Sequence, residues 1–312
     1  MKRFLYLLIF IPCISHTQDT SGLLEIKKDS VNKKYDSILN SYLKGKKDYK
    51  TMPWLANTAW SIKEIILSNI IAQDYINNYL LKLNEDALYT KEHFEFIRQF
   101  NQSSKNKAFC LFYQHTEKID MLMGHVGYAT SYIDYIIAKE NIDPYLWQKN
   151  KPVAEAPDWK HLRSIIIQKY NQNYAERTIL NAQIRWYEYK KDSISLVRYT
   201  IEKIDKYGLD TSAFGKLALN NMAYYIIFMY SNDKVALNKA IQWMEIILQK
   251  EPAPGNAEFI DTYANLLYKT GRINEALAME ANAIKLDPTA KDINDNYTKM
   301  KKREPTWQQT GQ

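Results

Sequence analysis

Few side chains in this sequence could support metal or nucleophilic chemistry. His115 and His125 flank the segment KIDMLMG, and neither belongs to a His-Glu-x-x-His or Cys-x-x-Cys motif, the kind of short spacing that zinc sites use. Cys110 precedes His115 by five residues, and at that helical spacing the two side chains do not align as a nucleophile and its base. We therefore expect no metal site, no cofactor and no cysteine nucleophile. Cys110 stands among aromatic residues and is expected to be a buried small filler.

Carboxylates are the remaining side chains that could support catalysis, and aspartate and glutamate total 35. In a helical toroid, two carboxyl groups roughly 5–10 Å apart can hydrolyse a glycosidic bond, which keeps a glycoside hydrolase as the enzymatic alternative. Such enzymes usually place their acids on long loops rich in glycine and aromatic residues, whereas the connections here are short. The sequence therefore favours a protein that is not an enzyme.

The elements that would position these residues are predicted to be helices. Glycine and proline number only nine each, and no proline occurs between Pro53 and Pro144. Period-two alternation is rare, so no strand is expected and the fold class is all-α. The expected helices cover residues 30–47, 54–83 as one helix or two, 90–101, 105–123, 128–140, 174–190, 193–207 and a segment starting after Asp158. Within residues 54–83 the predicted core stripe consists of Ile62, Ile65, Ile66 and Ile70.

Residues 257–288, AEFIDTYANLLYKTGRINEALAMEANAIKLDP, hold the most regular pattern in the chain. Two amphipathic helices are separated at Gly271, where a helix end favours a residue that tolerates the left-handed conformation. Pro288 stops the second helix because proline lacks an N–H donor. Ala264 and Ala276 are small enough for two antiparallel helices to approach closely.

This segment resembles a tetratricopeptide repeat. The resemblance rests on Ala264, Gly271, Ala276, Ala283 and Pro288. It departs from the family at Ile260, Leu267 and Glu280, where aromatic side chains are usual. Upstream, Ala240 lies 36 residues before Ala276, and Pro252 lies 36 residues before Pro288. This equal spacing indicates a neighbouring repeat. The resemblance implies antiparallel helix hairpins stacked into an α-α superhelix.

In this family the first helix of each hairpin builds a concave binding face. By that analogy the candidate groove residues are Asn220, Tyr224, Asp261, Asn265, Tyr268 and Lys269. A face that mixes aromatic and amide groups suits a peptide or a partner helix. The resemblance thus implies a protein- or peptide-binding scaffold. The alternative is that the chain's own N-terminal helices cover this face.

A second resemblance covers most of the chain after residue 17, and its motifs are specific only in roughly the last 90 residues of the chain. The run from Asn220 to Gly271 is similar to the C-terminal helical region of exported bacterial thioredoxin-family proteins. The Cys-x-x-Cys motif of that family is absent, so oxidoreductase activity is not implied. An accessory helical module of an envelope thiol-redox system is the alternative function.

Residues 1–17 are predicted to be a signal peptide, with Lys2 and Arg3 before an apolar run of 11 residues and a cleavage site before Gln18. Two alternatives remain: a lipoprotein cut before Cys13, although Pro12 fits that pattern poorly, and an uncleaved segment kept as an anchor. We expect a periplasmic or secreted protein with no membrane span after cleavage. The net charge of +7 is modest, and export argues against a nucleic-acid partner.

The predicted domains follow from these segments. An N-terminal helical bundle is expected over 18–150. The proline-bearing stretch 143–157 is expected to link it to repeats with a C-terminal capping helix over 158–304.

Overall fold

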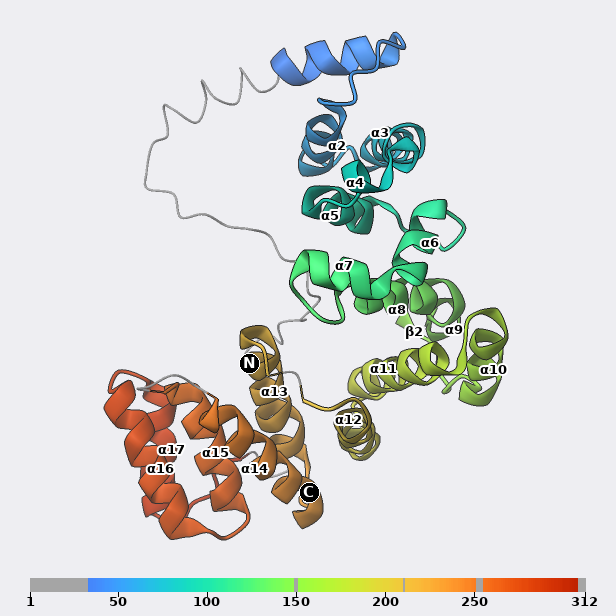
Figure 1. Ribbon diagram of the computed structural model, residues 1–312. Helices are drawn as coiled ribbons and strands as arrows, with labels where there is room; N and C mark the ends of the chain where they lie inside the picture. Colours follow the sequence, from blue (N-terminus) through green and yellow to red (C-terminus); the bar gives the residue numbers. More distant parts are fainter. Residues whose placement is uncertain (1–32, 149–150, 210, 251–254, 308–312) are drawn as a thin grey trace. The chain divides into compact units, whose positions relative to one another are not determined.

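The computed structural model describes residues 33–148, 151–209, 211–250 and 255–307. The predicted signal peptide and Cys13 lie outside these residues. Helices make up most of the described chain, which confirms the all-α class (Figure 1). The chain divides into two compact units, one ending at Ala129 and one beginning at Thr130. That division falls inside α8 (Tyr128–Asn141), earlier than the linker expected at 143–157.

The first unit is a series of short helices. A helix over residues 33–43 is followed by α2 (Met52–Ser61), α3 (Ile65–Asn78), the 3-10 helix η1 (Leu80–Lys82), α4 (Glu85–Leu88), α5 (Lys91–Phe100), α6 (Lys107–Gln114) and α7 (Thr116–Met123). The helix predicted over 105–123 is therefore two helices that separate at His115. Gly124 ends α7 in the left-handed conformation, with φ of 69°.

The isoleucine stripe predicted for this unit is wrong. The side chains of Ile66 and Ile70 are 80% and 55% exposed, and Ile62 and Ile65 are exposed as well. The buried side chains of α3 are instead those of Ser68, Ile71, Ala72, Tyr75 and Ile76. The helix packs on α2 and α5, and Tyr75 lies edge-on to Phe96 of α5. Lys63, with φ of 69°, breaks the predicted segment between the two helices.

The second unit contains α8 and ten further helices in the described chain. These are α9 (Asp143–Leu146), α10 (Trp159–Lys169), α11 (Gln172–Lys190), α12 (Ser193–Tyr207), α13 (Ala213–Asn221), the π-helix η2 (Met222–Phe228), α14 (Lys234–Gln249), α15 (Ala257–Lys269), α16 (Ile273–Leu286) and α17 (Lys291–Lys301). Two two-residue strands, β1 (Trp147–Gln148) and β2 (Lys151–Pro152), pair antiparallel. They correct the expectation that the chain forms no strand.

Local signals explain where several of these helices begin and end. The Asp158 carboxylate accepts hydrogen bonds from the backbone N–H groups of Lys160 and His161 and so caps α10. Asp192 caps α12 in the same way through Ser195 N–H. The π-helix η2 continues α13 directly and was not expected, because apolar periodicity does not distinguish a π-turn from an α-turn.

The helix pair predicted over 257–288 is present as α15 and α16. Gly271 adopts φ of 89° in the turn between them, and Ala264, Ala276 and Ala283 are fully buried. The two helices pack along each other, and α17 packs on both (Figure 1). Close contact between the helices therefore depends on small side chains, as the sequence indicates.

Candidate binding groove

The six predicted groove residues come from three elements of the second unit and are poorly exposed. Asn220 lies in the last turn of α13, Tyr224 lies in η2, and the other four lie on α15. Asn220, Asn265 and Tyr268 are buried, and the other three are only partly exposed. Two of the six are in direct contact, because the Asn265 side-chain amide donates to Asp261 Oδ1 at 2.8 Å.

The C-terminal segment, residues 291–307, covers the part of this face that belongs to α15. Asn296 of α17 donates to Asp261 Oδ1 at 2.9 Å, and the Tyr268 hydroxyl donates to the backbone oxygen of Glu304 at 3.0 Å. The cover on α15 is thus the chain's own C-terminal segment, whereas the alternative weighed from the sequence was the N-terminal helices.

Lys269 contacts both η2 and the same C-terminal segment. Its ammonium group donates to the backbone oxygen of Phe228 at 2.5 Å and lies 5.1 Å from the centre of the Trp307 ring. Burial lowers the pKa of Lys269 to about 8. An ammonium group that binds a ligand from solvent is usually well hydrated, whereas that of Lys269 is partly desolvated. In this conformation Lys269 therefore bonds to groups of the protein itself.

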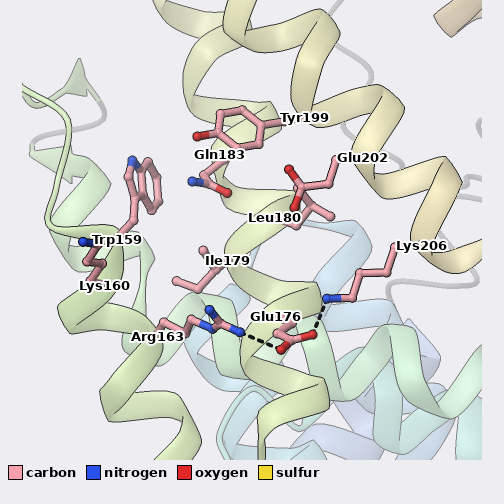
Figure 2. A pocket seen from close by; sticks show the side chains of 10 residues that line it. All are labelled: Trp159, Lys160, Arg163, Glu176, Ile179, Leu180, Gln183, Tyr199, Glu202 and Lys206. Carbon is pink, nitrogen blue, oxygen red and sulfur yellow. Dashed lines mark hydrogen bonds and ion pairs between the residues drawn. The ribbon is translucent and has the colours of Figure 1, made fainter.

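A different surface of the second unit is open. A groove with a volume of about 240 Å³ runs over α11 between α10 and α12, three consecutive helices in which both outer ones pack on α11. Figure 2 shows its lining: Trp159, Lys160 and Arg163 from α10; Glu176, Ile179, Leu180 and Gln183 from α11; and Tyr199, Glu202 and Lys206 from α12.

Aromatic and apolar side chains dominate one end of the groove. Trp159 and Tyr199 stand on its two sides, with Gln183 of α11 between them (Figure 2). Tyr187 stacks on Tyr199 with ring centres 5.4 Å apart, which fixes the orientation of that wall. Ile179 and Leu180 supply an apolar floor. An amide beside apolar and aromatic surface can bind a peptide group and bury a neighbouring side chain.

Charged side chains close the other end of the groove. Glu176 accepts from Arg163 Nη2 at 2.6 Å and from the Lys206 ammonium, so the three helices are joined at this point (Figure 2). The hydrogen bond from Lys206, followed by that from Gln172, lowers the pKa of Glu176 to about 2. Glu176 is therefore ionised at neutral pH and has no proton to give.

None of the residues that line this groove is among the six groove residues predicted from the sequence. The chain has 24 tyrosines, but their number does not say where aromatic surface gathers. Trp159, Gln183 and Tyr199 are far apart in the sequence and carry no common motif. Only the packing of α10 and α12 on α11 brings them together.

A second hollow, of about 390 Å³, lies in the first unit and is lined mainly by amides, including Gln73, Gln102 and Asn106. Gln73 donates to the Phe100 backbone oxygen at 2.9 Å and accepts from Asn106 at 2.9 Å. These amides largely satisfy one another, so the hollow offers fewer free hydrogen-bonding groups than its composition indicates.

In the described part of the chain, no group of three or more His, Cys, Asp or Glu side chains is placed so that it could hold a metal ion. Cys110 is exposed, so its expected role as a buried filler is wrong. None of the described helices combines the length and apolar character that a bilayer span requires.

No protein-family model, curated protein or solved structure matches this chain.

Proposed function

We propose that this chain is an exported helical-repeat scaffold of the tetratricopeptide kind that binds a protein or peptide segment in the cell envelope, with the groove over α11 as its binding site. The observation that carries the proposal is the groove's composition. It combines two aromatic walls, an apolar floor and one central amide on a surface that the second unit leaves open. The signal-like N-terminus supports export, and the hairpin pattern of α15 and α16 supports the repeat relationship.

The groove favours binding over glycoside hydrolysis. Its two carboxylates are Glu176 and Glu202, and hydrolysis needs one of them protonated as a general acid. Glu176 is held ionised by Lys206, Gln172 and Arg163. The groove is lined by only two carboxylates among aromatic, apolar and basic side chains, unlike the deep acidic cavity that a helical-toroid enzyme would need. We therefore propose no enzymatic activity for this site.

A peptide-display selection on the full chain tests the proposal. A selected peptide is expected to lose affinity tenfold or more when Gln183→Arg places a long cation on the groove floor. The matched control is Gln168→Arg, the same substitution at an exposed position of α10 outside the groove, which should leave affinity unchanged. Selected peptides that bind the Gln183→Arg protein as well as the unmodified chain would place binding elsewhere and refute the assignment.

A further inference from the structure

The C-terminal segment is attached to α15 through a few specific contacts. Besides the Asn296 and Glu304 hydrogen bonds, the ammonium of Lys269 lies between the rings of Phe228 and Trp307, at 5.4 and 5.1 Å from their centres. The buried residues of α17 are only Ile293, Asn296 and Met300. An isolated helix of this length is marginal in water, so α17 depends on these contacts and on its packing against α16 to stay folded.

A pair of carboxyl groups lies at the contact between this segment and α15–α16. Glu280 of α16 has a relative exposure of 0%, and its partner is the carboxyl group of Asp261. Among the described residues, no N–H or O–H group of another side chain or backbone reaches either oxygen of Glu280. Since two ionised carboxylates would both be acceptors, one proton must lie between them.

The surroundings keep that proton in place. The titratable groups facing the pair are Asp292 from α17 and Tyr224 from η2, and neither supplies positive charge. The two amide donors, Asn265 and Asn296, both serve Asp261. Asp261 is therefore the partner that can ionise, and Glu280 carries the proton.

We propose that α17 and residues 302–307 form a proton-locked cover over the α15 face, and that the cover opens with release to solvent of the proton shared by Asp261 and Glu280. In the covered state the Glu280 O–H bond is intact and donates to Asp261. On opening, water solvates both groups, the O–H bond breaks, and the proton passes to water or buffer. Opening exposes Asp261, Asn265, Tyr268 and Lys269, and it does not depend on the groove over α11.

The difference in the pKa of Glu280 between the covered and open states determines how strongly the opening equilibrium depends on pH. Burial, with the charge of Asp261 as the next cause, raises the pKa of Glu280 from 4.5 to about 11 in the covered state. Once solvated, the group returns toward its ordinary value. Between these limits each opening event releases one proton, so the opening equilibrium rises up to about tenfold for each pH unit.

Amide hydrogen exchange of the full chain between pH 6 and pH 8 tests the cover. Each rate is divided by the intrinsic rate at the same pH to give a protection factor. Amides of α17 are expected to be at least tenfold less protected than those of α14. Their protection should fall close to tenfold per pH unit in the unmodified chain and stay flat in Glu280→Gln.

Two further variants keep the result interpretable. Glu280→Met removes the same proton without an amide and should also give flat protection, which covers the case in which the glutamine variant does not fold. Glu275→Gln alters an exposed glutamate of the same helix that pairs with Arg272 and should leave the slope unchanged. A pH-independent α17 in the unmodified chain, a slope that persists without Glu280, or equal protection of α17 and α14 would each overturn the proposal.

Discussion

Replacing Glu280 by glutamine is expected to stabilise the protein at neutral pH, although Glu280 is fully buried. Buried polar residues usually destabilise when they are changed, because a partner is left unsatisfied. Here the native residue must bind a proton to fold, and glutamine needs none. The glutamine amide can donate to Asp261 in place of the carboxyl proton.

The magnitude follows from the two protonation states. The pKa of Glu280 is raised from 4.5 to about 11 on folding, so its favourable contribution is complete below pH 4.5 and is lost progressively as pH rises toward 11. At pH 7 the loss amounts to about 3 kcal/mol, at 1.36 kcal/mol for each of the 2.5 units between the unfolded pKa and the solution pH. Glu280→Gln should be stabilised by that amount at pH 7 and should match the unmodified protein near pH 4.5.

Differential scanning calorimetry at pH 4.5, 6, 7 and 8 measures this difference. For a unit of this size, about 3 kcal/mol corresponds to a rise in Tm of roughly 6–12 °C, confined to the transition of the second unit. Glu275→Gln serves as the control, because the pKa of Glu275 is lowered by Arg272 and the group does not titrate in this range. A Tm that falls in Glu280→Gln at pH 7, or a difference that does not change with pH, would refute the shared-proton account.

Three other substitutions test the packing and the groove. Ala276→Trp should destabilise the α15–α16 hairpin by about 1–3 kcal/mol or more, because a fully buried alanine contact cannot accept the volume; Ala278→Trp, at an exposed position of the same helix, should have little effect on Tm. Gly271→Ala should cost about 1 kcal/mol in chemical denaturation, since its φ of 89° is strained for alanine while no neighbour lies within 4 Å of the added carbon. Glu176→Gln should cost less than about 1 kcal/mol at pH 7, because Arg163 and Lys206 are 45% and 42% exposed. The Glu176 difference should shrink as pH falls from 4.5 toward 2.

Each of these results has an outcome that contradicts it. Equal melting temperatures for the two tryptophan variants would show that α15 and α16 are not in close contact at Ala276. An unaffected Gly271→Ala protein would mean that the turn does not need a left-handed residue. A Glu176→Gln loss that persists unchanged at pH 2 would exclude the ion pairs as its cause.

Helix boundaries were readable from the sequence because their signals are local. Asp158 and Asp192 bond backbone N–H groups two or three residues ahead, and Gly271 meets a conformational need in its own turn. Signals of this kind require no knowledge of the rest of the fold. The prediction for α12, residues 193–207, accordingly agrees with the structure to the residue.

The core of the first unit was not readable, because α3 has apolar side chains on more than one face. Ile62, Ile66 and Ile70 keep helical spacing, and so do Ile71, Tyr75 and Ile76. The structure buries the second set, with α3 packed on both α2 and α5. On the α2 side, Ser68 Oγ donates to the backbone oxygen of Ala56 at 2.7 Å. A choice between two apolar faces depends on the partner helix, which the pattern within α3 does not contain.

The groove was missed for a related reason. Trp159, Gln183 and Tyr199 come from three helices, and each alone is an ordinary residue of a helix surface. They share one property: α10 and α12 both pack on α11, and a groove lies over α11 between these two helices. The abundance of tyrosine was the one available signal, and it indicates aromatic surface without locating it.

The departure at Glu280 and the cover on α15 are best understood as one feature. The repeat pattern has an aromatic side chain where this chain has Glu280, and an aromatic ring would fill that space whatever the pH. A carboxyl group can occupy it only when it is protonated and when Asp261, itself bonded to Asn296 of α17, is there to accept the proton. Glu280 thus makes the proposed packing of α17 conditional on a proton, which an apolar residue at this position would not do.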